Sequence, residues 1–226
     1  MIGCEKCNHN GYIHINSVEV VSCECVKKND FNIKVRDAKI PKKLIKLTLE
    51  DWNLKQDRNG GDLSPNQVKN KEKSYLVLRE LCDNKAFPRH PIVIDDEPRS
   101  SVIFHGPKGS GKTLCLSVLS KRALKYGGLV RFYDWYDLVA ILDRYDNRTE
   151  LDAVVYDFEN CDLIAVDNVD KIEIGNHAKN QLTRLFRKRT NNEMWTIISA
   201  TEQALTNNPF PGWDDFKNDS YALRLT

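Results

Sequence analysis

The chain has 226 residues, of which 41% are hydrophobic and 29% charged, enough for one α/β domain and a small appendage. Its net charge of +2 is too small to indicate nucleic-acid binding by itself. The longest apolar runs, such as 163–166, are too short to cross a bilayer, and the first residues lack the apolar stretch of a signal peptide. These features argue against a membrane protein and predict a cytoplasmic one, whose cysteines stay reduced.

Composition divides the chain into three predicted regions. Residues 1–26 hold four of the seven cysteines and read as a small cysteine segment. Residues 27–63 are mostly polar and broken by turn-like residues, which predicts a linker that holds a short apolar patch at 44–52. Residues 64–226 alternate between helical and strand patterns and are predicted to form the main domain.

Two cysteine pairs flank a hairpin pattern in the first region. Cys4-x-x-Cys7 and Cys23-x-Cys25 are separated by 15 residues, which contain the strand-like runs Gly-Tyr-Ile-His-Ile and Val-Glu-Val-Val. Four thiolates at the ends of a hairpin suit one tetrahedral Zn²⁺, and metal binding would supply the folding energy that so short a segment lacks. Redox use of Cys4 and Cys7 is the alternative interpretation.

Helices and strands are predicted to alternate from residue 64 onward. Ser64-Pro-Asn-Gln67 is a capping box with proline at the first helical position, so a helix should begin there. The remaining pattern predicts an α/β fold, with a central parallel sheet flanked by helices on both faces. The predicted strands are 101–105, 129–133, 162–167 and 195–199, and the predicted helices are 112–126, 136–144, 150–159, 178–190 and 214–225.

The segment from Gly106 to Thr113 matches the P-loop pattern G-x-x-x-x-G-K-[ST] and has a predicted strand before it and a helix after it. Its glycines allow backbone N–H groups to surround phosphate oxygens, and the following helix adds its positive end. Lys112 is predicted to contact the β- and γ-phosphates, and Thr113 to hold Mg²⁺. The guanine motif N-K-x-D is absent, which favours ATP. The residues predicted to bind the nucleotide are Gly106, Pro107, Lys108, Gly109, Ser110, Gly111, Lys112 and Thr113.

An apolar run ends in a carboxylate at Leu163-Ile-Ala-Val-Asp167, the pattern of a Walker B strand. Asp167 is therefore predicted to hold Mg²⁺ together with Thr113, and to be catalytic with Lys112. The next position is Asn168, an amide that cannot take a proton from water. Either Asp170 substitutes as the base or hydrolysis is slow.

Three further features are candidates for function. The strand at 196–201 ends in hydroxyl residues, and Thr201 or Ser199 is a candidate γ-phosphate sensor. Arg224 could reach the nucleotide of a neighbouring subunit as an arginine finger. The helix around 184–189 is basic and reads either as a solvated face or as a surface for single-stranded DNA.

Together these motifs resemble the DnaC/DnaI-type AAA+ helicase loaders and their IstB-like transposition relatives. The resemblance rests on Gly106–Thr113, the run ending at Asp167, the basic helix and the 196–201 strand. The cysteine segment is similar to the zinc ribbon that many loaders carry ahead of their ATPase core. Residues 64–226 would then be the AAA+-type ATPase domain, and Arg224 would lie on the arginine-finger helix. Asn168 and Thr201 depart from the acidic residue and the asparagine that the family often has there.

The resemblance implies an ATP-dependent loader that delivers a hexameric replicative helicase to single-stranded DNA and forms a homo-oligomer when ATP is bound. Lys112, Thr113 and Asp167 would act in cis and Arg224 in trans, with ATP, Mg²⁺ and Zn²⁺ as ligands. The zinc segment would be the arm that contacts the helicase or DNA. Two alternatives remain open: an IstB-like transposition ATPase, and an ATP-gated adaptor that hardly hydrolyses its nucleotide.

Overall fold

The computed structural model describes residues 4–8, 11–16, 19–56, 61–84, 86–94, 96–144, 147–170 and 174–225. It confirms the predicted strands and all but the last of the predicted helices. The strands of the main sheet are β5 (Ser101–His105), β6 (Val130–Asp134), β7 (Leu163–Val169), β8 (Trp195–Ala200) and β9 (Tyr221–Arg224). The helices of the main domain are α2 (Pro65–Asp83), α3 (Lys112–Lys125), α4 (Trp135–Asp143), α5 (Arg148–Asn160), α6 (Asn176–Asn191), α7 (Glu202–Asn207) and α8 (Trp213–Asp219).

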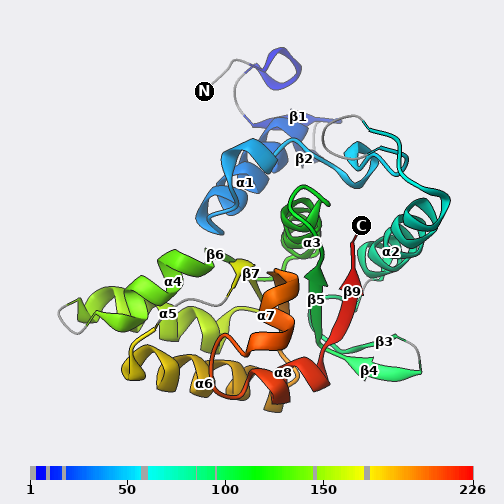
Figure 1. Ribbon diagram of the computed structural model, residues 1–226. Coiled ribbons are helices and arrows are strands. Elements are labelled where there is room, and N and C mark those ends of the chain that lie inside the picture. The colour runs from blue at the N-terminus through cyan, green and yellow to red at the C-terminus, as the bar shows by residue number, and fades with distance from the viewer. Residues whose placement is uncertain are drawn as a thin grey trace.

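The central sheet has the strand order β6-β7-β8-β5-β9, and every neighbouring pair is parallel. Parallel strands need a crossover connection, and helices supply it here between successive strands. Figure 1 shows β5 leading into α3, with β9 beside it and the C-terminus near α2. A short antiparallel pair, β3 (Ile92–Ile94) and β4 (Glu97–Arg99), precedes β5.

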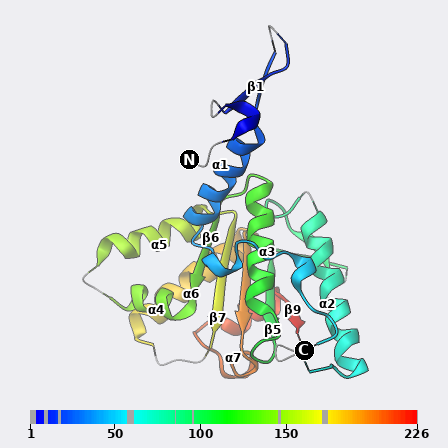
Figure 2. The ribbon, with the colours of Figure 1, turned by 90° about the horizontal axis from the view of Figure 1, so that it is seen from above.

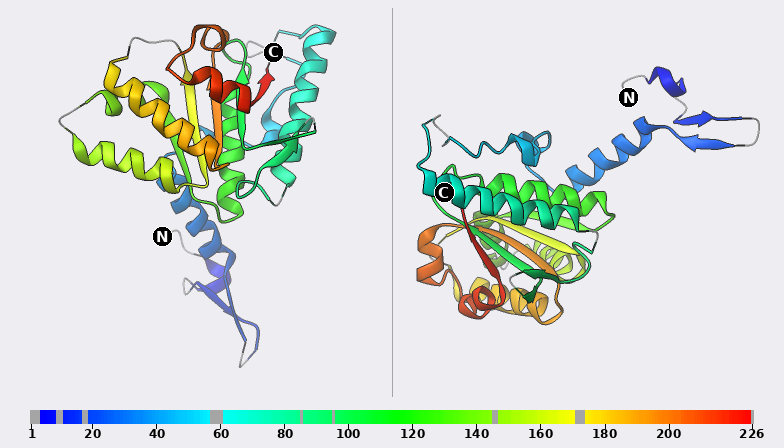
Figure 3. Two further views of the ribbon diagram at one scale, coloured as in Figure 1. Left: turned by 90° about the horizontal axis from the view of Figure 1, so that it is seen from below. Right: turned by 90° about the vertical axis from the view of Figure 1, so that its right-hand side faces the viewer.

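The sheet separates two apolar cores. On one face, α2, α3 and buried side chains between Val35 and Trp52 pack against alternate side chains of the strands, such as Val102 and Phe104 of β5. On the other face, Ile103 and its counterparts pack against α4, α5, α6, α7 and α8. Figure 3 shows these three layers edge-on. Because successive side chains of a strand point to opposite faces, burial on both sides accounts for the nearly continuous apolar runs of these strands.

Side-chain caps fix where the helices around the site begin. The Ser64 and Gln67 side chains form the predicted capping box of α2. The Asp134 carboxylate accepts from the Tyr136 N–H at the start of α4, and Thr201 accepts from Ala204 at the start of α7. Asp134 is the last residue of β6, and Thr201 directly follows β8. The caps therefore hold both polar side chains at the carboxyl edge of the sheet.

The prediction of a helix at 214–225 is wrong. Helix α8 ends at Asp219, and the chain continues as strand β9, which pairs with the edge of β5. Leu223 and Leu225 are buried while Ala222 and Arg224 are exposed, the alternation of a strand with one face on the core. Pairing with β5 satisfies backbone groups that the edge of β5 would otherwise leave without partners. Arg224 therefore lies on a strand, not on a helix.

The N-terminal part projects from this body (Figure 2). Strands β1 (Tyr12–His14) and β2 (Val20–Ser22) form the predicted hairpin, and helix α1 (Glu24–Asp37) connects it to the main domain. The predicted linker thus holds most of an α-helix, followed by the short 3₁₀ helices η2 (Lys42–Leu44) and η3 (Leu49–Asp51). Buried side chains from this region, including Val35, Leu44 and Trp52, belong to or adjoin the core next to α3. The division of the chain at residues 26 and 63 stays a prediction.

Candidate nucleotide-binding site

The P-loop lies at the carboxyl edge of the sheet, between β5 and the first residue of α3. Gly106, Gly109 and Gly111 have φ values of +139°, +91° and +101°, which side-chain-bearing residues rarely adopt. A Cβ on Gly106 would collide with the carbonyl oxygen of Leu225, the residue that follows β9. Glycine is required there because β9 approaches the loop so closely. The backbone N–H groups at the start of α3 are left to face an anion.

Lys112 folds back over its own loop. Its Nζ donates to the carbonyl oxygens of Gly106 at 2.7 Å and Pro107 at 2.8 Å. Burial lowers the pKa of this ammonium, while the charge of Asp167 acts in the opposite direction. Two neutral carbonyl acceptors thus hold the lysine at the loop. The charged phosphate oxygens of ATP would take the place of these carbonyls as acceptors.

Asp167 is the last of five consecutive buried residues of β7 and lies next to the P-loop helix. The Thr113 hydroxyl donates to its Oδ1 at 3.1 Å, and the Ser199 hydroxyl of β8 donates to the same oxygen. Burial raises the pKa of Asp167, and the hydrogen bonds from Ser199 and Thr113 partly offset this effect. One carboxylate beside one hydroxyl, both predicted Mg²⁺ ligands, is a set of hard oxygen donors that suits this cation.

Asn168 lies at a bulge between β7 and β8 and has a left-handed φ of +63°. Its exposed side chain donates from Nδ2 to Oδ2 of Asp134 at 2.9 Å, and its backbone N–H donates to the Ser199 hydroxyl at 2.8 Å. Asp134 and Asp167 occupy paired positions on β6 and β7. Asp134 thus brings a second carboxylate to the site, which sequence reasoning missed because Asp134 belongs to a different strand.

Thr201, a candidate phosphate sensor, and Asp170, a candidate base, contact each other. The Thr201 hydroxyl donates to Asp170 at 2.8 Å while it caps α7. Asp170, the suggested substitute base, is thus held by Thr201. Of the two hydroxyl residues considered as sensors, Ser199 is the one that contacts Asp167. A sensor role for Thr201 stays a prediction.

Arg224 lies at the same edge of the sheet as its own P-loop, opposite His105 of β5 in the register. Its Nε is 3.2 Å from Oε1 of Glu202, and Nδ1 of His105 is 3.3 Å from the other oxygen of that carboxylate. Burial lowers the pKa of His105, although the charge of Glu202 opposes this effect. The Arg224 side chain remains 66% exposed, so its guanidinium can be approached from outside the protein.

A cleft of about 910 Å³ opens beside the P-loop. Lys112, Thr113 and Asp167 line it, as do the side chains of Asp134 and Asn168. Its opposite wall is part of the predicted linker, from Lys39 to Leu44, and α4 and α5 close its far end. This volume is within the range of small-ligand sites.

Hydrogen bonds join residues 38–52 to the P-loop and to helix α3. The Leu44 carbonyl accepts from the Ser117 hydroxyl at 3.3 Å and from Lys121 at 3.0 Å. The Trp52 indole donates to the Ser110 carbonyl at 3.2 Å, and a Cβ on Gly111 would lie 2.7 Å from its Nε1. Trp52 therefore covers the back of the phosphate loop. The predicted apolar patch at 44–52 contains this residue, but the sequence did not predict its contact with the loop.

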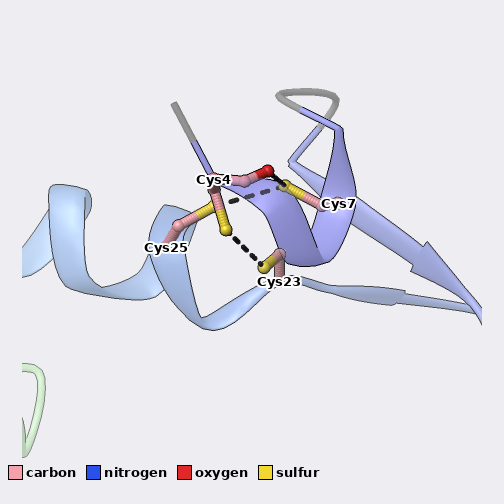
Figure 4. A group of neighbouring side chains, drawn as sticks. All are labelled: Cys4, Cys7, Cys23 and Cys25. Atoms are coloured by element: carbon pink, nitrogen blue, oxygen red, sulfur yellow. Dashed lines mark hydrogen bonds between the residues drawn. The ribbon is translucent and has the colours of Figure 1, made fainter. Parts of the chain in front are cut away.

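The four N-terminal cysteines converge, as their spacing predicted (Figure 4). Their sulfur atoms all lie within 4.8 Å of one another, with Cys4–Cys23 at 3.8 Å and Cys7–Cys25 at 3.6 Å. Disulfide sulfurs would be about 2.05 Å apart, and none of the four cysteines forms a disulfide. Zn–S bonds of about 2.3 Å in a tetrahedron place sulfurs about 3.8 Å apart, so the donor set fits zinc.

The basic face of α6, formed by the exposed side chains of Arg184, Arg187 and Lys188, has two of its three cations facing carboxylates. Arg187 lies 3.7 Å from Asp215, and Lys188 lies 2.8 Å from Glu159. Arg189 of the same helix is fully buried, where it donates to Thr196 and to the carbonyls of Phe158 and Cys161. Its contribution is to packing between α6 and the sheet.

Fold and site together define a P-loop ATP-binding protein with the architecture of AAA+ domains. Residues 94–223 match the family described as IstB-like ATP binding protein, and the chain belongs to that family. Among curated proteins, none matches this chain. Among the described residues, no helix has the length and apolarity to span a bilayer.

Solved structures show the same fold at low sequence identity. The DnaC helicase loader is 15% identical, with a TM-score of 0.55, over 82% of this chain and all of that one. DnaI is 12% identical, with a TM-score of 0.58, over 84% of this chain and 97% of that one. A DNA replication initiation factor is 15% identical, with a TM-score of 0.59; the match covers 80% of this chain but only 49% of that protein.

Proposed function

We propose that this protein is an ATP-dependent loader that delivers a hexameric replicative helicase to single-stranded DNA. The observation that carries this proposal is the structural similarity to the DnaC helicase loader over 82% of this chain, together with a complete P-loop and Asp167. ATP would bind in the cleft beside Lys112, with Mg²⁺ at Thr113 and Asp167. The loader would be active as a homo-oligomer, with Arg224 reaching the nucleotide of the next subunit.

The cysteine hairpin would be the helicase-docking arm, held in shape by Zn²⁺. It projects from the body on α1 and exposes apolar side chains: Tyr12 is 57% exposed, Ile15 59% and Val20 47%. Exposed apolar side chains on a projecting element offer contacts to a protein partner. Zinc would keep the hairpin rigid enough to present it.

Hydrolysis of ATP needs a group that takes a proton from the attacking water. We propose Asp134, because its carboxylate lies in the cleft and is bonded to Asn168 at the position where the family often has an acid. A proton of the water would move to Asp134 while the water oxygen bonds to the γ-phosphorus. The bond from that phosphorus to the β–γ bridging oxygen breaks, and ADP leaves with its electrons. Asn168 would orient the water.

Asp134→Asn tests this assignment, because asparagine can still cap α4 but cannot accept the proton. Turnover should fall by about 100- to 10,000-fold, while the affinity for a fluorescent ATP analogue stays within about twofold. Asp152→Asn, an exposed carboxylate on α5 that does not line the cleft, is the matched control. Normal turnover in Asp134→Asn would assign the base elsewhere. Equally slow turnover in the unmodified protein and Asp134→Asn would favour the ATP-gated adaptor.

Loading itself is tested by recruitment. The protein is mixed with candidate hexameric helicases and circular single-stranded DNA, and helicase retained on the DNA is measured with and without ATP. Retention should require both the protein and Lys112. The family match also supports a transposition ATPase as a second candidate function. Binding to a transposase, with no retention of any helicase, would establish that alternative.

A further inference from the structure

Positive charge is concentrated between the cysteine hairpin and the P-loop domain. Residues 27–46 hold eight of the 34 Lys and Arg residues but two of the 32 Asp and Glu residues, a net charge of +6. The other 206 residues therefore carry a net charge of −4. All eight cations are exposed. Within the described ranges, no ion pair neutralises the seven lysines, and Arg36 is 3.6 Å from Asp37. Such a block of like charge favours an anionic partner.

Part of this segment forms one wall of a groove. Helix α1 and the end of α3 enclose about 660 Å³. Lys27, Phe31 and Lys34 line it from α1, at spacings of four and three residues that place them on one face of the helix. Lys125, from the last turn of α3, lies across the groove. Lys28, Asp30 and Leu124 complete the lining.

We propose that this groove binds single-stranded DNA, with its lysines on the phosphates and Phe31 stacked against a base. Cations that follow the backbone, with an aromatic ring among them, are how proteins bind single strands without reading sequence. The proposal rests on the proposed function and assigns its DNA contact to a particular surface. Asp30 faces the same groove and reduces its charge, but four lysines outnumber it.

The basic face of α6 is the rival surface within the chain. Two of its three cations already face carboxylates, as described above. The hollow beside it is lined by polar and basic side chains and proline, with no aromatic residue among them. The α1–α3 groove has both unpaired lysines and an aromatic side chain, which favours it as the DNA site.

The test compares two charge reversals of equal size in the full-length chain. One variant carries Lys27→Glu, Lys28→Glu and Lys34→Glu; the matched control carries the corresponding changes at Arg184, Arg187 and Lys188. Binding of fluorescent oligo(dT) is measured by anisotropy between 50 and 200 mM salt. The groove variant should bind at least about tenfold more weakly, with a salt slope shallower by about 2, because each phosphate contact contributes about 0.7. The α6 variant should change by less than about twofold. The reverse result, or equal losses, would overturn the proposal.

Phe31→Leu separates stacking from charge. It keeps an apolar side chain against the core and should weaken oligo(dT) binding by about 5- to 100-fold with an unchanged salt slope. A helicase pull-down distinguishes a DNA-binding groove from a protein-docking groove. If the groove variant loses the helicase but keeps oligo(dT), the groove is a protein-docking surface and the proposal fails. If the unmodified chain binds oligo(dT) through the groove but retains no helicase, loading fails and the groove assignment stands.

Discussion

Replacing Trp52 by alanine should strongly destabilise the protein, although Trp52 lies in a segment whose sequence reads as a linker. The side chain is 6% exposed, covers Gly111 and donates to the Ser110 carbonyl. Truncating a buried tryptophan typically costs about 3–5 kcal/mol, of which the lost hydrogen bond accounts for about 1 kcal/mol. For a chain of this size the melting temperature should fall by roughly 6–20 °C.

Thermal unfolding followed by circular dichroism measures this effect. Tyr156→Ala is the control, because that ring is 66% exposed and its loss should change stability by no more than about 0.5 kcal/mol. Trp52→Phe should be milder, since it keeps an apolar ring and loses the hydrogen bond. It also serves if the alanine variant does not fold. A Trp52→Ala variant that melts within about 2 °C of Tyr156→Ala would refute the docking of this segment on the P-loop.

Three further predictions concern charge, assembly and metal. Burial raises the pKa of Asp167, so its deprotonation costs stability that grows as pH rises through the unfolded-state value of about 3.9. Asp167→Asn should therefore be more stable than the unmodified protein at pH 7, and this advantage should vanish below pH 4; denaturant titrations without Mg²⁺ at both pH values measure it. Lys112→Ala and Arg224→Ala should each abolish hydrolysis, and mixing them should restore part of it if Arg224 acts on a neighbour's nucleotide. A mixture as inactive as its components would place Arg224 in cis. Purified protein should contain one zinc per chain; its removal by a chelator, or Cys23→Ser, should unfold the hairpin while the nucleotide domain keeps its melting temperature. A metal-free protein with a folded hairpin would contradict this prediction.

Local patterns were sufficient to predict most of the main domain. The P-loop, the capping box at Ser64 and the apolar strands each depend on residues close together in the chain, so their signals can be read in order. The convergence of the cysteines was also readable, because a hairpin brings its two ends together. The prediction of a helix for the last residues was wrong, although Leu223 and Leu225 alternate with other residues in the way typical of a strand.

The kind of ligand follows from a local motif, because the P-loop forms a phosphate cradle wherever a strand and a helix flank it. Which side chains surround that cradle depends on how the strands and helices pack. Asp134 reaches Asn168 because β6 pairs with β7, and Trp52 reaches Gly111 because the segment after α1 folds back onto α3. Arg224 reaches Glu202 because β9 adds to the sheet edge. These contacts join residues far apart in the chain, and such pairings depend on the packing of whole elements, which no local pattern encodes.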